Sequence, residues 1–297
     1  MNKIAITGVN GFVGKNLSAY LKSAGYLIEG FDRRSIDKLN HDTDCEVIIH
    51  LAGKAHDLKG SANEDEYMKV NFELTRTLFD SFLRSNARCF IFLSSVKAAA
   101  DSLKEPLTEE YIPDPATAYG RSKLRAEQYM QSQVLPDGKA FYILRPCMIH
   151  GPGNKGNLNL LYKFVATGVP YPFAAFENKR SFLSVDNLCF AIEHLLKKRI
   201  PSGIYNVADD ESLSTNEVVT SLARFSGKKP RLWKVRPGLI KFLTSLGDKL
   251  KLPLNSEKLN KLTENYVVSN RKIVRALNID LPLSSRGGLE KTVKSFL

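Results

Sequence analysis

A tyrosine and a lysine stand four residues apart in the segment Tyr119-Gly-Arg-Ser-Lys123, where the sequence pattern predicts the start of a helix over 119–133. Residues four apart lie on one face of a helix, so the phenol and the ammonium group are predicted to be neighbours. A free tyrosine, with a pKa near ~10, is a poor base at neutral pH, and a nearby cation favours its ionised form. The pair is suited to move a proton while a nicotinamide moves a hydride.

Two serines, Ser94 and Ser95, close the apolar run 87–95, which predicts a buried strand. A hydroxyl at the end of a strand can orient a substrate alcohol or carbonyl. A Tyr-x-x-x-Lys pair alone also occurs by chance on the surface of helices. The strand-end serine, 24 residues before Tyr119, is therefore part of the argument for a catalytic site.

Three glycines, Gly8, Gly11 and Gly14, lie between a β-prone run (2–7) and an apolar-periodic helix (12–24). Glycines in this context allow a tight turn, backbone approach to a pyrophosphate and close packing of helix on strand. Asp32 ends the next predicted strand, where a carboxylate can hold the adenosine ribose hydroxyls. The pattern predicts dinucleotide binding, with NAD favoured. NADP stays open, because Arg33 and Arg34 follow directly and can bind a 2′-phosphate.

These groups need a scaffold that brings strand ends together. Near-continuous apolar runs over 26–31, 45–52, 87–95 and 140–144 alternate with predicted helices over 67–85 and 119–133. That alternation predicts an α/β fold: a Rossmann-type doubly wound parallel sheet with helices on both faces. We expect a cofactor-binding domain over 1–150, with a return segment at about 181–208. A smaller mixed α/β substrate domain is expected over 151–180 and 209–297.

Composition is that of a folded protein of 297 residues, with 43% hydrophobic and 25% charged residues. No apolar run approaches the roughly 18 residues of a membrane span, and the amino terminus lacks a signal-peptide layout. A cytoplasmic protein is expected. The four cysteines form no C-x-x-C pair and the histidines lack zinc-ligand spacing, which predicts buried thiols and no metal site.

The net charge of +12 is concentrated late in the chain, where residues 228–297 hold 16 Lys/Arg and 5 Asp/Glu. Such a region can face nucleic acid, an anionic membrane or a phosphorylated ligand, or be a solvated face. It lacks a helix-turn-helix or zinc-finger pattern, so no nucleic acid is expected. Residues 238–252 are amphipathic, basic and rich in Leu. We favour a helix that covers the substrate domain's core over contact with an anionic membrane or a glycosyltransferase.

Several motifs occur together and in order along most of the chain. They are Thr7-Gly-Val-Asn-Gly-Phe-Val-Gly14, His50-Leu-Ala-Gly53, Asn71, Ser94-Ser95, Tyr119-x-x-x-Lys123, Arg145-Pro146, Gly151-Pro-Gly153 and Arg180-Ser-Phe-Leu-Ser-Val-Asp186. With them, the chain resembles an extended short-chain dehydrogenase/reductase of the NAD-dependent epimerase/dehydratase family.

The resemblance implies roles for individual residues and makes a homodimer plausible. Ser95, Tyr119 and Lys123 would be the catalytic residues. Those implied in cofactor binding are Gly8, Asn10, Gly11, Phe12, Val13, Gly14, Asp32, Arg33, Leu51, Ala52, Gly53, Asn71, Ser94, Tyr119, Lys123 and Pro146. Those implied in substrate binding are Ser95, Lys97, Asn154, Lys155, Asn157 and Arg180, with Arg180 at the substrate's diphosphate.

Within the family, the chain is similar to the C4 epimerases and 4-keto reductases of UDP-N-acetylhexosamines. Val96-Lys97 stands where the 4,6-dehydratases carry an Asp-Glu pair, which disfavours dehydration. Met148 replaces an asparagine of the galactose epimerases, so the sugar pocket differs from theirs. The expected function is a UDP-hexose or UDP-N-acetylhexosamine 4-epimerase of surface-polysaccharide biosynthesis. The alternatives are a UDP-4-keto-6-deoxy-N-acetylhexosamine 4-reductase and a non-catalytic NAD(P) sensor or nucleic-acid binder on the same fold.

Overall fold

A computed structural model describes residues 3–32, 35, 39, 44–54, 63–154, 156–249 and 255–296. Arg33, Arg34 and Lys155, to which the sequence assigned roles, lie outside the described residues. No helix in the described ranges has the length and apolar character needed to cross a bilayer.

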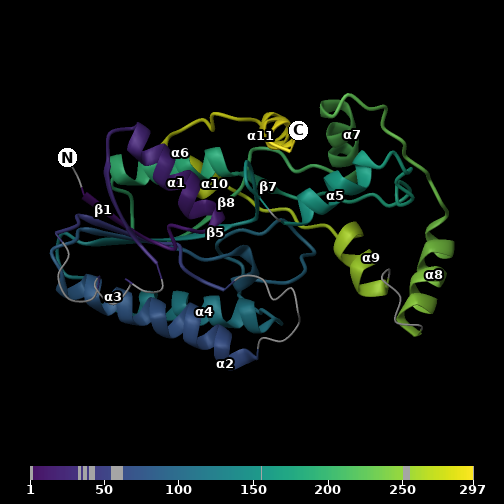
Figure 1. Cartoon of the computed structure of the whole chain (residues 1–297). Helices are drawn as coiled ribbons and strands as arrows, with labels where there is room; N and C mark the ends of the chain where they lie inside the picture. Colours follow the sequence, from purple (N-terminus) through teal and green to yellow (C-terminus); the bar gives the residue numbers. More distant parts are fainter. Residues whose placement is uncertain are drawn as a thin grey trace.

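A six-stranded parallel sheet forms the centre of the molecule (Figure 1). Its strands, in spatial order, are β2 (Leu27–Phe31), β1 (Lys3–Thr7), β3 (Val47–His50), β4 (Cys89–Leu93), β5 (Ala140–Pro146) and β8 (Gly203–Val207). Strands β1, β3, β4 and β5 are buried almost throughout, as a parallel sheet covered on both faces requires. The strand order reverses between β1 and β3, and such a reversal is where doubly wound folds bind their ligands. The predicted fold class is confirmed.

Helices cover both faces of this sheet, as Figure 1 shows. One face carries α1 (Phe12–Ser23), α6 (Val185–Lys197) and α10 (Arg271–Leu277), with α1 packed on α6. The opposite face carries α3 (Leu74–Arg84) and α4 (Ala118–Ser132). Two separate hydrophobic clusters fill these layers. The four cysteines are free and buried, as predicted.

The predicted helix 67–85 begins earlier in the structure and is interrupted. It starts as α2 (Glu64–Tyr67), because the side chain of Asn63 accepts a hydrogen bond from the Glu66 amide (2.9 Å) and caps the first turn. A π-helical turn, Met68–Glu73, then leads into α3. Such turns widen a helix locally and are frequent at functional sites. This one contains the buried Asn71.

The rest of the chain packs beyond one end of the sheet around a third hydrophobic cluster. Its elements are β6 (Met148–His150), α5 (Asn157–Ala166), β7 (Phe182–Ser184), α7 (Thr215–Phe225), α8 (Pro237–Lys249), α9 (Ser256–Thr263) and α11 (Ser285–Lys294). Strands β6 and β7 pair in parallel. Arg180 forms backbone bridges with Leu213 and Tyr266, so three distant segments meet beside β7. Helix α8 lies at the outer edge (Figure 1).

Candidate active site

The glycine turn after β1 leaves no room for side chains. Gly8 has φ +72°, and a Cβ there would lie 2.8 Å from the backbone nitrogen of Ala52. A Cβ on Gly14 would collide with the Gly8 carbonyl oxygen, which already accepts a hydrogen bond from the Gly11 amide (2.9 Å). Turn, helix and the chain after β3 therefore meet closely enough for backbone amides to reach a bound diphosphate.

The amino terminus of α1 points its amides into this turn. Its first residue is Phe12, and its N-cap, Gly11, offers no side-chain hydrogen bond. The first amides of a helix have no partner within the helix, and together with the helix dipole they bind anions. Asn10, Phe12 and Val13 lie in this turn and in the first turn of the helix. The geometry fits the pyrophosphate of a dinucleotide.

Asp32 follows β2, the strand that pairs with β1. Its Oδ1 accepts hydrogen bonds from the Ser35 amide (3.2 Å) and the Ser35 hydroxyl (3.1 Å). These bonds fix the carboxylate near the glycine turn, because the Phe31 carbonyl just before it accepts from the Gly8 amide (2.9 Å). The carboxylate is therefore at the strand end where the sequence placed it.

The segment after β3 is locked to helix α4 by Asn71. The Asn71 Oδ1 accepts from the Lys54 amide (2.8 Å), and its Nδ2 donates to the Lys54 carbonyl and to Ser122 Oγ (both 3.0 Å). A Cβ on Gly53 would lie 3.0 Å from Asn71 Oδ1 and 3.1 Å from Lys123 Nζ. Three residues implied in cofactor binding, Gly53, Asn71 and Lys123, thus converge on one point.

Lys123 is buried at the centre of this group. Its Nζ donates to the Leu93 carbonyl (2.9 Å) and lies 4.6 Å from the centroid of the Phe92 ring. Burial lowers the pKa of Lys123 to about 8, although the nearby Glu127 carboxylate acts in the opposite direction.

Tyr119 lies one turn earlier on α4 and packs edge-on against the Tyr67 ring, with centroids 6.2 Å apart. Burial raises the pKa of Tyr119, and a side-chain hydrogen bond with Ser95 opposes that rise. The sequence argument predicted that Lys123 would lower the pKa of Tyr119, and that expectation is wrong for the protein alone. Desolvation of the phenolate is the stronger effect in this structure.

A second polar cluster lies next to Lys123. The sequence argument named Ser94 from this cluster but did not identify its buried charged pair. Ser94 donates to the Glu127 carboxylate, and Glu127 in turn pairs with Arg145, with 2.5 Å between Arg145 Nη2 and Glu127 Oε2. Both charged side chains are at most 1% exposed. Through Glu127, helix α4 is therefore connected to Ser94 at the end of β4 and to Arg145 near the end of β5. The Tyr-x-x-x-Lys spacing could have pointed to Glu127, one further turn along α4.

His50 is a further site residue, and its motif alone did not indicate a role for its side chain. It is fully buried between Thr7 Oγ1 (2.7 Å from Nδ1) and Thr75 Oγ1 (3.0 Å from Nε2). Thr7 Oγ1 also accepts from the Ala52 amide (3.2 Å). Burial, with a smaller effect from the Lys123 charge, lowers the pKa of His50 to about 3. The neutral ring connects β1, β3 and α3 behind the cofactor turn. No group of three or more potential metal ligands occurs in the described part of the chain.

Of the residues implied in substrate binding, Ser95 is hydrogen-bonded to Tyr119, and Lys97 follows Ser95 in the same turn. Ser95 caps the short 3-10 turn Val96–Ala98, where its hydroxyl accepts from the Lys97 amide (3.2 Å). Lys97 Nζ donates to the Asp101 carbonyl (2.7 Å) and lies 4.4 Å from the centroid of the Tyr266 ring. Tyr266 bridges to Arg180, whose guanidinium is 3.7 Å from Glu264.

Asn154 shapes the loop before α5. Its Nδ2 donates to the Ile149 carbonyl (3.3 Å), and its Oδ1 accepts from the Gly156 amide (2.8 Å). Asn157 is the first residue of α5, and the N-cap residue Gly156 provides no side-chain bond. The helix therefore begins with open amides, as α1 does.

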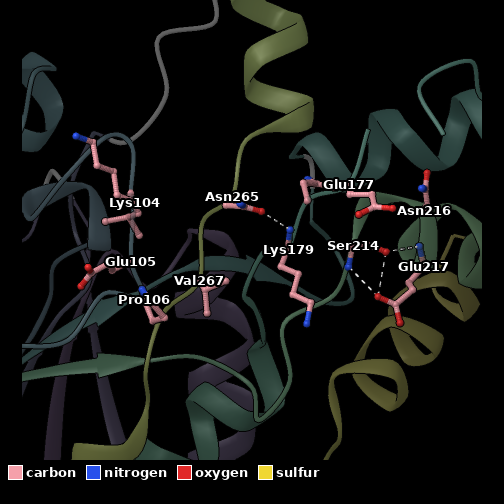
Figure 2. Close-up of a pocket in the computed structure, with 12 residues that line it drawn as sticks. Lys104, Glu105, Pro106, Glu177, Lys179, Ser214, Asn216, Glu217, Asn265 and Val267 are labelled. Carbon is pink, nitrogen blue, oxygen red and sulfur yellow. Dashed lines mark hydrogen bonds between the residues drawn. The ribbon is translucent and has the colours of Figure 1, made fainter. Parts of the chain in front are cut away.

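A cavity of about 730 Å³ lies beside the Arg180 segment (Figure 2). Lys179 and Asn265 line it, joined by a hydrogen bond from the Lys179 amide to Asn265 Oδ1 (2.8 Å). Successive side chains of an extended segment point to opposite sides, so this cavity is on the side of Lys179 rather than of Arg180. Its lining contains none of the predicted site residues.

Comparison with known proteins agrees with this architecture. The model of the NAD dependent epimerase/dehydratase family matches residues 4–208. The UDP-glucose 4-epimerase of Vibrio cholerae is 29% identical over 99% of this chain and 95% of its own length. The UDP-N-acetylglucosamine 4-epimerase of Bacillus cereus superposes with a TM-score of 0.78 at 22% identity, covering 99% of both chains. The dTDP-4-dehydrorhamnose reductase of Bacillus anthracis, solved with NADP, gives 0.78 at 19% identity over the whole of both chains.

Proposed function

Because the chain belongs to the NAD-dependent epimerase/dehydratase family, we propose that it is a 4-epimerase of UDP-linked hexoses or N-acetylhexosamines in surface-polysaccharide biosynthesis. One observation carries the proposal. The phenol of Tyr119, hydrogen-bonded to Ser95, and the ammonium of Lys123 lie on consecutive turns of α4. Gly53 lies beside Lys123, and the neighbouring Ala52 packs against Gly8 of the glycine turn. This arrangement supports a site in which proton-transfer groups lie beside a bound dinucleotide.

The cofactor would be held mainly by backbone. We assign the pyrophosphate to the turn Gly8–Gly14 and the adenosine ribose to Asp32. Gly53 and Asn71, with Leu51 and Ala52, would shape the wall next to the nicotinamide. Pro146 and Ser94 would close the site from β5 and β4. When bound, NAD supplies the acceptor and donor of the hydride at C4 of the sugar.

The chain's own residues would move the proton. Tyr119 would take the proton of the C4 hydroxyl and later return it, and Ser95 would orient that oxygen by a hydrogen bond. Burial of Tyr119 raises its pKa in the protein alone, so proton removal needs added positive charge nearby. Lys123, whose charge is held within the site, supplies part of it below about pH 8.

Substrate would be bound from the side of the smaller domain, which we place over 151–180 and 209–297. Arg180 would pair with the diphosphate, which suits a planar guanidinium that presents two parallel donors. Asn154, Lys155 and Asn157 precede or open α5, whose amino terminus favours an anion. Lys97 would contact the sugar from the Ser95 turn. The Vibrio cholerae relative is named for UDP-glucose, which supports a UDP-linked substrate.

The amount of cofactor consumed per turnover tests the proposal. An epimerase regenerates its NAD, so a catalytic amount suffices and no NADH accumulates. We expect turnover of a UDP-linked hexose or N-acetylhexosamine under those conditions. Consumption of one NADH or NADPH per turnover with a 4-keto-6-deoxy sugar would instead identify a reductase, because the same side chains serve both reactions.

A further inference from the structure

Helix α8 exposes a complete apolar stripe. Leu239, Phe242, Leu243 and Leu246 follow the i, i+3, i+4, i+7 spacing and are 52%, 65%, 51% and 42% exposed. Spacing of this kind places them along one face of the helix. Soluble proteins expose single apolar side chains often, but a contiguous stripe on one helix marks an interaction surface.

The side chains of this stripe do not belong to the hydrophobic core of the smaller domain. Ile240 and Thr244, on a different face of α8, are 4% and 1% exposed. Helix α8 packs against α9, and Ile240 belongs to the third hydrophobic cluster. The sequence favoured a helix that simply covers the core. The structure shows that one face does so and that a second apolar face remains outside.

A further exposed apolar side chain, Trp233, lies four residues before the start of α8. Its amide donates to the Tyr171 carbonyl (2.8 Å), and its carbonyl accepts from the Ala174 amide (3.2 Å), so the backbone is fixed. The side chain is nevertheless 59% exposed. An indole held outward on a rigid backbone is the arrangement typical of residues at a membrane–water interface.

Exposed positive charge is concentrated on the first turns of α8 and on the segment that leads into it. The exposed cations between residues 228 and 241 are Lys228, Lys229, Arg231, Lys234, Arg236 and Lys241. The sequence from 226 to 249 holds one acidic residue, Asp248. Apolar side chains bordered by cations match a surface that presents hydrocarbon beneath a layer of negative charge.

We propose that α8 and Trp233 form a docking surface for an anionic lipid bilayer. With 13 residues, α8 is about 20 Å long, and it would lie in the plane of the interface rather than cross it. Its stripe would enter the headgroup–acyl boundary and its cations would meet lipid phosphates. Helix α8 lies at the outer edge of the molecule (Figure 1), and the side chains of its stripe are exposed. This inference is independent of the proposed activity.

The single tryptophan of the chain gives a direct readout. Purified full-length protein is titrated with vesicles of phosphatidylcholine alone or with one-quarter phosphatidylglycerol. We expect a blue shift of Trp233 emission, quenching by brominated acyl chains and co-sedimentation with the anionic vesicles, all weakened by salt. A spectrum unchanged by anionic vesicles, with no co-sedimentation, would overturn the proposal.

Two variants separate the contributions of the surface. Phe242→Ser with Leu243→Ser should weaken vesicle binding at least tenfold, and Lys234→Glu with Arg236→Glu should do the same for anionic vesicles. A matched control, Leu27→Ser with Val134→Ser, removes two apolar side chains elsewhere that are at least as exposed, at 53% and 89%, and should bind as the wild type does. Circular dichroism and thermal melts establish that each variant folds. A stripe variant that binds as tightly as the wild type would contradict the proposal. Self-association through the stripe without vesicle binding, detected as an increased mass by light scattering, would also contradict the proposal.

Discussion

Arg145 and Glu127 form an ion pair from which solvent is excluded, with 2.5 Å between Arg145 Nη2 and Glu127 Oε2. Glu127 also accepts a hydrogen bond from the hydroxyl of Ser94, the neighbour of Ser95. The pair therefore connects α4, which carries Tyr119 and Lys123, to the ends of β4 and β5. It joins these three elements directly beside the candidate site.

Breaking this pair should be costly. Glu127→Gln leaves the Arg145 charge buried without a counter-charge, and we expect a loss of about 3–5 kcal/mol in the free energy of unfolding by urea. The control is Glu64→Gln, which removes the exposed partner of Arg121 at 2.8 Å. That change should leave stability nearly unaltered. Equal effects of the two substitutions would show that burial of the first pair carries no energetic consequence.

His50 should make stability depend on pH. Its pKa is lowered from 6.5 to about 3 by burial, so the unfolded chain takes up a proton below pH 6.5 while the folded protein does not. The stabilisation is fully present above pH 6.5 and is lost as the pH falls toward 3, by at most about 5 kcal/mol. His50→Gln removes this contribution. Unfolding free energies measured from pH 7 to 3.5 should therefore converge for the two proteins on acidification, and parallel curves would contradict the assignment.

Gly14 should tolerate no side chain. A Cβ there collides with the Gly8 carbonyl, so Gly14→Ala must open the turn, at a cost of about 1–3 kcal/mol. We expect NAD affinity, measured by calorimetry, to fall at least tenfold. Gly238→Ala is the matched control, because nothing lies within 4 Å of its Cβ position. Full NAD affinity in the Gly14 variant would place the pyrophosphate elsewhere.

Local patterns in the sequence were enough to predict the strands of the sheet and the helices beside it, because each depends on residues close together in the chain. The glycine turn and the pair Tyr119 and Lys123 are far apart in sequence. Their common location follows from the parallel fold, which gathers the carboxyl ends of its strands at one edge. Helical spacing places Glu127 on the face of Tyr119 and Lys123, but it does not indicate the partners of Glu127. Ser94 and Arg145 are 51 residues apart, near the ends of different strands, so only the fold shows that they meet Glu127.

Two other features depend on burial, which the sequence pattern does not measure. The pKa of Tyr119 is decided by desolvation rather than by the lysine four residues on. Likewise, the sequence shows that α8 is amphipathic. It does not show that Ile240 packs inward while Phe242 stays outside.

Tyr119→Phe should separate chemistry from binding. It removes the phenolic oxygen and keeps the ring that packs on Tyr67, so the site should stay folded. We expect turnover to fall at least about a hundredfold, the contribution of a positioned acid–base group, with NAD affinity unchanged. Turnover by the variant at the wild-type rate would remove Tyr119 from the mechanism.

The most direct test of the account is proton NMR of UDP-N-acetylglucosamine incubated with the purified protein and a catalytic amount of NAD. The account predicts that signals of UDP-N-acetylgalactosamine appear and approach a constant ratio, without net absorbance from NADH. If the folded, NAD-binding protein leaves this substrate and UDP-glucose unchanged, C4 epimerisation of UDP-hexoses is contradicted.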